Sequence, residues 1–215
     1  MTERRLITSS VASSTGDTSY AMFIIVMLSL LLFPSVGPRL VQTQANSQPL
    51  DEAYQVYSTV IRKRYVNDST KMILVFAETT PNKDRGSQPD RENLRHILMP
   101  LTQSTLDSYK ENGKKVTKLE EKLDLPVTYT LITRAEFDEM FSRDNFSGWE
   151  NLYRKYPKVS GIIWLSEIGF NSDQTQALVY VTHGCGATRG EGGYFLLAKE
   201  SGAWKVVTEI MVMAA

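Results

Sequence analysis

The chain has 215 residues, and its 24 Lys and Arg residues are balanced by 24 Asp and Glu residues, so the formal net charge is zero. With 42% hydrophobic and 22% charged residues, the composition excludes a disordered chain, a collagen-like chain and a small disulfide-stapled protein. The zero net charge argues against sequence-independent nucleic-acid binding, which needs a basic surface. The single cysteine, Cys185, cannot form an intramolecular disulfide.

The first 45 residues have the pattern of an export signal. Ala21–Phe33 is an apolar run interrupted only by Ser29 and ended by Pro34. A helix that crosses a bilayer needs roughly 20 apolar residues, so this shorter run is typical of the hydrophobic region of a signal peptide. Thr43-Gln44-Ala45 supplies small residues for cleavage. We therefore predict a secreted or periplasmic protein, with an uncleaved N-terminal membrane anchor and a buried core helix as the alternatives.

This interpretation divides the chain into three parts. Residues 1–45 are the signal peptide or anchor, residues 46–50 are a linker, and residues 51–215 are a single α+β domain. Loss of residues 1–45 removes three of the 24 basic and two of the 24 acidic residues, which leaves 21 and 22. The near-neutral charge is therefore a property of the predicted domain.

Five segments of the predicted domain have helical patterns. In residues 51–65 the apolar positions recur at helical spacing, and acidic residues occupy the first turn. Thr133 precedes Glu136 at capping-box spacing, which predicts a helix start there. The predicted helices are 51–65, a short one at 91–99, 103–125 with an interruption near Asn112-Gly113, 134–141, and 147–156.

Short apolar or alternating runs predict the strands, and most of them come late in the chain. The predicted strands are 72–79, 127–132, 161–170, 177–183, 194–200 and 204–213, with a loop at 80–90 and a tight turn at Ser201-Gly202. Short connections join the last four. The expected fold class is therefore α+β, with N-terminal helices packed on a C-terminal four-stranded antiparallel meander.

The densest group of chemically capable residues is the glycine-rich segment 181–193. It contains His183, Cys185, Arg189 and Glu191 together with five glycines. Because glycine allows tight turns and close backbone approach, residues 184–192 are expected to form a loop that turns or cradles a ligand. The candidate ligand-binding residues are Gly184, Gly186, Arg189, Gly190 and Gly192.

Several site types fit this segment poorly. It lacks the Gly-Lys-Ser/Thr of a phosphate-binding loop, and a dinucleotide fingerprint from Gly184 would need glycine where Arg189 stands. His183 and Cys185 share strand parity, but their side chains would be about 7 Å apart, too far for a direct hydrogen bond. His183, Cys185 and Glu191 could ligate a metal, yet no recognised ligand spacing accompanies them. We predict no metal and no cofactor.

A second chemical hypothesis uses carboxylates inside the strands. If Gly169 pairs with Ala177, Glu167 falls on the same sheet face as His183, and a Glu–His pair can perform general acid–base chemistry. A register change of one residue removes this arrangement. The catalytic candidates are His183, Cys185, Glu191 and Glu167, and the alternative is that these residues are structural.

The C-terminal segments resemble a known group of proteins. These are residues 168–181 (IGFNSDQTQALVYV), 183–186 (HGCG), 190–199 (GEGGYFLLAK) and 202–207 (GAWKVV). They look like a group of uncharacterised exported bacterial proteins that end in such a meander. The resemblance covers roughly residues 50–215 and implies an exported location and this architecture, with no assigned activity. Members often carry a second cysteine in the glycine-rich segment, which this chain lacks. The layout is also similar to cystatin-like and nuclear-transport-factor-two-like sheets.

The expected function is that of an exported, non-catalytic α+β domain that binds a protein partner or a small ligand. The alternative is an extracytoplasmic hydrolase that uses the glycine-rich segment with Glu167. A third hypothesis is a membrane-anchored accessory protein, in contact with the membrane only through an uncleaved N-terminal segment. No nucleic-acid partner is expected. The hydrolase requires His183, Cys185, Glu191 and Glu167 to converge on one pocket.

Overall fold

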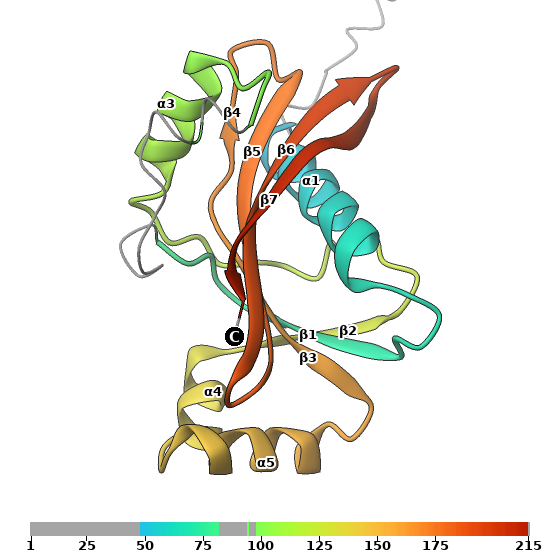
Figure 1. Ribbon diagram of the computed structural model, residues 1–215, viewed down its shortest axis with the longest axis vertical. Coiled ribbons are helices and arrows are strands. Elements are labelled where there is room, and N and C mark those ends of the chain that lie inside the picture. Colours follow the sequence, from blue (N-terminus) through green and yellow to red (C-terminus); the bar gives the residue numbers. More distant parts are fainter. Residues whose placement is uncertain (1–47, 82–93, 95–97, 215) are drawn as a thin grey trace, which may run out of the picture. The chain divides into compact units, whose positions relative to one another are not determined.

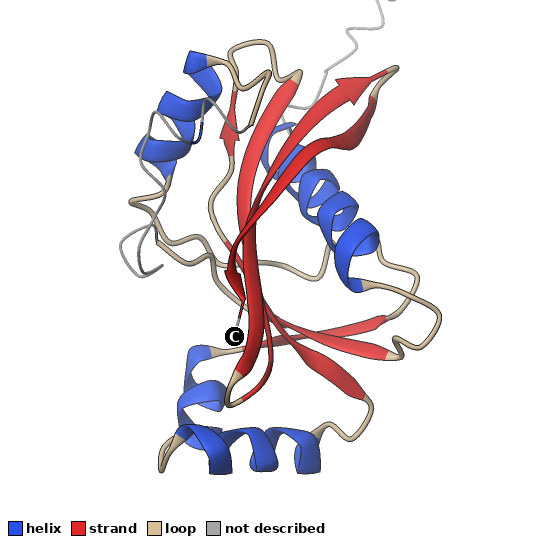
Figure 2. Ribbon diagram, viewed as in Figure 1, coloured by secondary structure: helices blue, strands red, loops and turns tan. Residues whose placement is uncertain are grey.

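A mixed sheet forms the centre of the computed structural model, which describes residues 48–81, 94 and 98–214 (Figure 1). Its seven strands run in the order β2-β1-β3-β5-β6-β7, and β4 pairs separately with β5. The strands are β1 (Met72–Phe76), β2 (Thr128–Ile132), β3 (Val159–Leu165), β4 (Gly169–Phe170), β5 (Gln176–Gly186), β6 (Arg189–Glu200) and β7 (Ala203–Ala214). The helices are α1 (Gln48–Tyr65), α3 (Gln103–Asn112), α4 (Arg134–Met140) and α5 (Asn145–Lys155), as Figure 2 shows.

The predicted four-stranded antiparallel meander is wrong, and so is the cystatin-like layout suggested for it. β3, β5, β6 and β7 are antiparallel neighbours, but β1 pairs in parallel with both β2 and β3. The segments that form β1 and β2 were expected to be strands. Their apolar runs, however, do not indicate which strand each pairs with or whether the pairing is parallel. The class α+β still describes the molecule broadly, because the described helices pack on one sheet that contains both parallel and antiparallel pairs.

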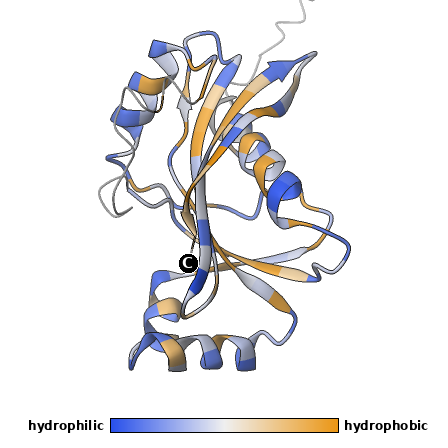
Figure 3. Cartoon of the chain, viewed as in Figure 1, coloured by the Kyte–Doolittle hydropathy of each residue, from blue (hydrophilic) through white to orange (hydrophobic). Residues whose placement is uncertain are grey.

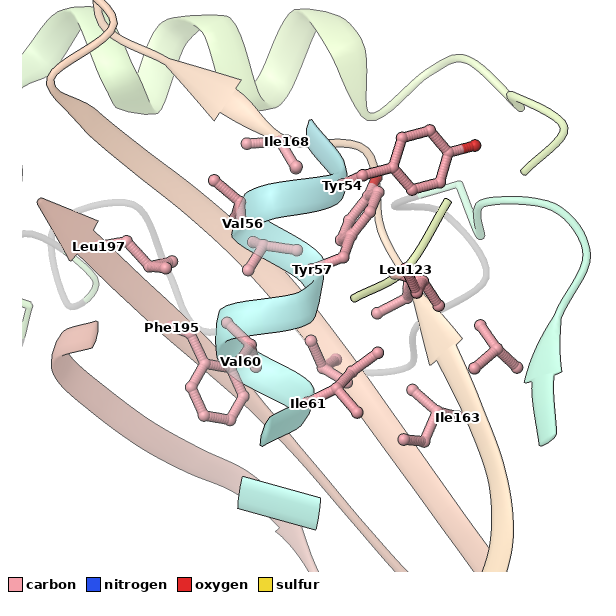
Figure 4. Close-up of a cluster of buried hydrophobic side chains, with 14 of the residues drawn as sticks. Tyr54, Val56, Tyr57, Val60, Ile61, Leu123, Ile163, Ile168, Phe195 and Leu197 are labelled. Atoms are coloured by element: carbon pink, nitrogen blue, oxygen red, sulfur yellow. The ribbon is translucent and has the colours of Figure 1, made fainter. Parts of the chain in front are cut away.

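One face of the sheet is covered by α1. Val56, Val60 and Ile61 on this helix are fully buried against Ile163 and Phe195 of the sheet (Figure 4). These helix positions are among those at which the sequence pattern predicted an apolar face. By contrast, the last turn of α1 holds three basic residues and is hydrophilic (Figure 3). The helix therefore packs along its length and ends in a charged cluster.

The opposite face is covered by two groups of helices. Leu106 and Tyr109 of α3 pack on β5 and β6, next to Tyr194. Met140 of α4 and Leu152 of α5 pack on β1, β2 and β3. The predicted capping box is confirmed, since the Thr133 hydroxyl and the Glu136 carboxylate each accept a hydrogen bond from the other's backbone N–H.

The edge strand β7 carries two extra residues relative to β6. Leu196 and Leu197 pair with Thr208 and Val206, so Val207 is left unpaired in a bulge, and Val212 occupies a second bulge near Gly192. Both valines are exposed, at 42% and 39%. Because bulges disrupt the hydrogen-bonding pattern of an edge, they protect β7 against pairing with another strand.

Several predicted boundaries differ from the structure. The helix expected over 103–125 ends at Asn112, and the strand expected over 161–170 breaks after Leu165. The loop expected over 184–192 is a hairpin, because β5 extends to Gly186 and β6 starts at Arg189. The linker expected at 46–50 is wrong over residues 48–50, because α1 already starts at Gln48. Residues 46–47, the export signal, and most of the predicted loop at 80–90 and helix at 91–99 lie outside the described residues. Within the described part of the chain, no helix is long and apolar enough to cross a bilayer.

Candidate functional site

The carboxyl ends of three parallel strands meet at one edge of the sheet. β1 is parallel to both β2 and β3, so the residues that follow them lie close together. An antiparallel bridge joins Glu78, after β1, to Lys118, and a parallel bridge joins Thr80 to Ser166, after β3. In sheets with parallel strands, ligands bind preferentially beyond these carboxyl ends. The polar residues at this edge are therefore candidates for a ligand-binding site.

A pocket of about 400 Å³ opens beside this edge. It lies between the N-terminal half of α1, the segment after α3 and the segment after β3, and Figure 4 shows Tyr54, Tyr57 and Ile168 together there. Its lining is mostly apolar, with a few polar groups, as in small-molecule sites. The lining residues are Ala53, Tyr54, Tyr57, Asn112, Lys115, Thr117, Leu119, Glu167, Ile168 and Phe170.

Glu167 is the only acidic residue among the described residues of that lining, and its carboxylate is held in place from one side. The Thr79 hydroxyl donates to Glu167 Oε1 at 2.6 Å, and the backbone N–H of Thr117 donates to the Thr79 hydroxyl oxygen at 2.8 Å. Glu167 Oε2 has no hydrogen-bond partner among the described residues, and it is not a buried atom. One carboxylate oxygen is therefore anchored while the other remains accessible.

The backbone around Glu167 is fixed by neighbouring elements. The Tyr57 hydroxyl donates to the carbonyl oxygen of Ser166 at 2.8 Å, and the Ser166 hydroxyl accepts from the backbone N–H of Tyr180 at 2.8 Å. On the other side, Asn112 Nδ2 donates to the carbonyl oxygen of Ile168 at 2.9 Å. Helix α1, helix α3 and strand β5 therefore position the pocket segment before any ligand arrives.

Two further contacts define the rim of the pocket. Lys115 Nζ donates to Asn112 Oδ1 at 3.1 Å, and the Lys115 side chain is exposed. The Tyr54 hydroxyl accepts a hydrogen bond from the backbone N–H of Glu120, which ties the segment after α3 to α1. Burial raises the pKa of Tyr54 above its usual value, so this phenol stays neutral.

The glycine-rich hairpin brings His183 and Glu191 together, since they are opposite residues on β5 and β6. His183 Nε2 lies 3.0 Å from the carbonyl oxygen of Ser160, and its ring centroid is 5.2 Å from that of Tyr65. Burial lowers the pKa of His183, so the imidazole is neutral at pH 7 and donates to Ser160. Arg64 binds the Glu191 carboxylate through two hydrogen bonds of 2.7 and 3.0 Å.

The remaining catalytic candidates do not join this pair. Cys185 is a half-buried free thiol, and no hydrogen bond among the described residues connects it to His183. Gly169 pairs with Leu178 instead of the expected Ala177, although β3 pairs with β5 in the expected register, with Leu165 opposite Val181. Ile163 pairs with His183, and Glu167 lies four residues further on, about 13 Å along the strand direction. The four residues therefore do not converge on one pocket.

The glycines of the hairpin make room for neighbouring rings and backbone. A Cβ at Gly184 would lie 3.0 Å from Trp164 and 3.2 Å from Trp149, and a Cβ at Gly192 would lie 2.4 Å from the Tyr180 hydroxyl oxygen. At Gly190 it would lie 3.0 Å from the carbonyl oxygen of His183. Packing thus accounts for these three glycines.

Gly186 and Arg189 border a different, more open hollow at the hairpin tip. Helix α5 supplies its other wall, including Phe146, which is 68% exposed, and Tyr153, whose hydroxyl donates to the carbonyl oxygen of Cys185 at 2.8 Å. Gly186 and Arg189 are thus two predicted ligand-binding residues that border a hollow in the described part of the chain. Among the described residues, no group of three or more His, Cys, Asp or Glu side chains is placed to hold a metal ion.

Sequence reasoning included Glu167 but missed the rest of the pocket. Tyr54 lies next to the apolar face of α1 and Tyr57 lies on it, so both are easily read as core. Asn112 was noted only as a helix interruption. The signal that could have found the pocket is that interruption, which ends α3 and lets the following segment cross the sheet edge.

Comparison with known proteins adds no assignment to this geometry. No family model matches the chain, and no curated protein and no solved structure matches it.

Proposed function

We propose that this chain is an exported, non-catalytic domain that binds a small organic molecule in the pocket between α1 and the segments after α3 and β3. The observation that carries this proposal is Glu167, a carboxylate with one oxygen anchored by Thr79 and the other accessible in a mostly apolar pocket. Binding is proposed in preference to hydrolysis because the lining residues that the structure describes include no histidine, cysteine or second carboxylate.

The proposal is tested by filling the pocket. Ala53 lines it from α1, so Ala53→Leu adds three methyl-sized carbons into the space without a new charge. We expect 2-phenylethanol, 2-phenylethylammonium or 3-phenylpropionate to shift the amide NMR signals of pocket residues in the full-length chain, and Ala53→Leu to abolish that shift. Ala203→Leu, at an exposed position on β7, is the matched control. Absence of pocket shifts with all three probes, or shifts unchanged in Ala53→Leu, would contradict the proposal.

Export is the second part of the proposal, and the sequence alone supports it. Its basis is the apolar run Ala21–Phe33 followed by the small residues Thr43-Gln44-Ala45. The resemblance to exported bacterial proteins agrees with it. N-terminal sequencing of the mature protein is expected to start at Asn46, whereas material that keeps residues 1–45 in a membrane fraction would indicate the anchor.

A further inference from the structure

From the charges around the pocket, we infer that its ligand is an organic ammonium ion with an apolar body; this rests on the proposed binding function. The juxtaposition that carries the inference is Glu167, a carboxylate with no ion-pair partner among the described residues, in one pocket lining with the aromatic side chains Tyr54, Tyr57 and Phe170. A cation with an apolar body is the ligand that uses both features at once.

Glu167 differs from every other partly buried acid that the structure describes. Six acidic residues in the described ranges are partly buried, and all are glutamates. Five of them have a basic nitrogen within 4 Å: Glu52 with Lys199, Glu78 with Arg134, Glu136 with Lys155, Glu191 with Arg64, and Glu209 with Arg64 and Lys63. Glu167 has no such partner within the described ranges. Among the described residues, therefore, nothing basic faces its carboxylate, and we infer that the ligand supplies a cation there.

The basic residue nearest this pocket does not take that role. Lys115 lines the pocket, but its ammonium group donates to Asn112 Oδ1 and its side chain is exposed at the rim. A partly buried carboxylate that accepts only one hydroxyl hydrogen bond is less stabilised than one that faces a cation. A bound ammonium would donate to Glu167 Oε2, the oxygen that the protein leaves without a donor.

The apolar part of the lining specifies the rest of the ligand. Tyr54, Tyr57 and Phe170 are aromatic members of the lining, and aromatic rings attract cations as well as apolar groups. Ile168 and Leu119 complete an apolar wall. With about 400 Å³ of space, the pocket suits a small molecule with an aryl or alkyl body rather than a bare metal ion.

Three probes that share a phenylethyl body test this class: 2-phenylethylammonium as the cation, 2-phenylethanol as the neutral analogue and 3-phenylpropionate as the anion. Their affinities for the full-length chain are measured by NMR titration and calorimetry at low and at physiological salt. We expect the cation to bind about tenfold more tightly than the alcohol, as one charge-assisted hydrogen bond provides. Glu167→Gln is expected to reduce cation binding to the level of the alcohol and to leave the alcohol unchanged.

Glu150→Gln is the matched control, because Glu150 is exposed and lies away from the pocket on α5. It should leave all three affinities unchanged. Equal binding of cation and alcohol, tightest binding of the anion, or a Glu167→Gln variant with full cation affinity would overturn the ammonium assignment and leave the pocket proposal standing. No pocket binding by any probe would overturn the proposed function itself.

Discussion

Two regions beside α1, the charged cluster at its last turn and the pocket next to its N-terminal half, hold partly buried acidic residues differently. At its C-terminal end, Arg64 binds Glu191 and lies 3.7 Å from Glu209, while Tyr65 packs on His183. At its N-terminal half, Tyr54 and Tyr57 border a pocket in which Glu167 has no cationic partner among the described residues. At the first end, the acidic side chains face basic ones. At the second end, Glu167 Oε2 has no hydrogen-bond partner among the described residues, and it is this oxygen that a ligand would use.

The largest expected loss of stability is at Gly161, a residue of β3 that packs against Gly184 and His183 of the hairpin. Its φ is +131°, and a Cβ there would lie 2.2 Å from the carbonyl oxygen of Gly184 and 2.6 Å from His183 Nε2. Gly161→Ala is expected to lower the free energy of unfolding by about 3 kcal/mol, measured by urea denaturation. Gly202→Ala, at φ +84° with nothing within 4 Å, isolates the backbone strain and should cost about 1 kcal/mol. If Gly161→Ala and Gly202→Ala lowered the free energy of unfolding equally, the close contacts around Gly161 would not be the cause.

Removal of Arg64 is expected to have the next largest effect. Arg64→Met leaves Glu191 and Glu209 without their shared guanidinium, although Lys63 remains 3.8 Å from Glu209. Because these side chains are about one-third exposed, we expect a loss of about 1–2 kcal/mol in urea denaturation, less than for a fully buried pair. Arg62→Met, whose partner Asp124 is exposed, is the control and should change stability by about 0.5 kcal/mol or less.

Thr79→Val tests the anchor of the pocket. The substitution keeps the side-chain shape but removes the hydroxyl that donates to Glu167 and accepts from the Thr117 N–H. We expect a loss of about 1 kcal/mol in stability and weaker binding of 2-phenylethylammonium, because Glu167 is no longer held in one orientation. Full cation affinity in a folded Thr79→Val protein would show that this anchor does not position the carboxylate.

The pH dependence of stability tests whether the His183 imidazole is buried and neutral in the folded protein. Burial lowers the pKa of His183 in the folded state, so the unfolded chain binds more protons below the ordinary histidine pKa of about 6.5. Stability should therefore decrease as the pH falls from 7 to 5, and His183→Gln should show a shallower decrease. The difference between the two proteins isolates His183 from His96. Parallel curves would contradict a buried, neutral imidazole.

The smallest expected effect on stability is that of Glu167→Gln. The glutamine oxygen can still accept from Thr79, and no ion pair among the described residues is lost. We expect a change within about 0.5 kcal/mol of wild type in urea denaturation, or a slight gain. A loss of 2 kcal/mol or more would mean that the Glu167 charge is already compensated, which contradicts the contrast between the two ends of α1.

Local patterns predicted the elements better than their assembly. The helical spacing of Val56, Val60 and Ile61 and the cap at Thr133 depend on neighbours in sequence, and both are as expected. The parallel pairing of β1 depends on residues far apart in the chain, which one sequence does not reveal. Glycine was interpreted as a sign of a loop in 184–192, but there it makes room for rings such as Trp149 and Trp164 within a continuous hairpin.

The candidate site was predicted only in part for the same reason. Glu167 was singled out, but its expected partner, His183, is bonded elsewhere, and its actual partner, Thr79, is 88 residues away in the chain. The lining residues Asn112 and Phe170 reach the pocket through the end of α3 and the short strand β4. A pocket assembled from such separated segments has no local sequence signature.

The most direct test determines whether the cation binds in the pocket beside the N-terminal half of α1 or near the hairpin beside its last turn. In a titration of the isotope-labelled full-length chain with 2-phenylethylammonium, the account predicts that amide signals of Ala53, Thr117, Glu167 and Phe170 shift together and saturate. Those of His183, Cys185 and Glu191 should stay unchanged. Shifts confined to the hairpin residues, with the pocket residues unmoved, would contradict the account.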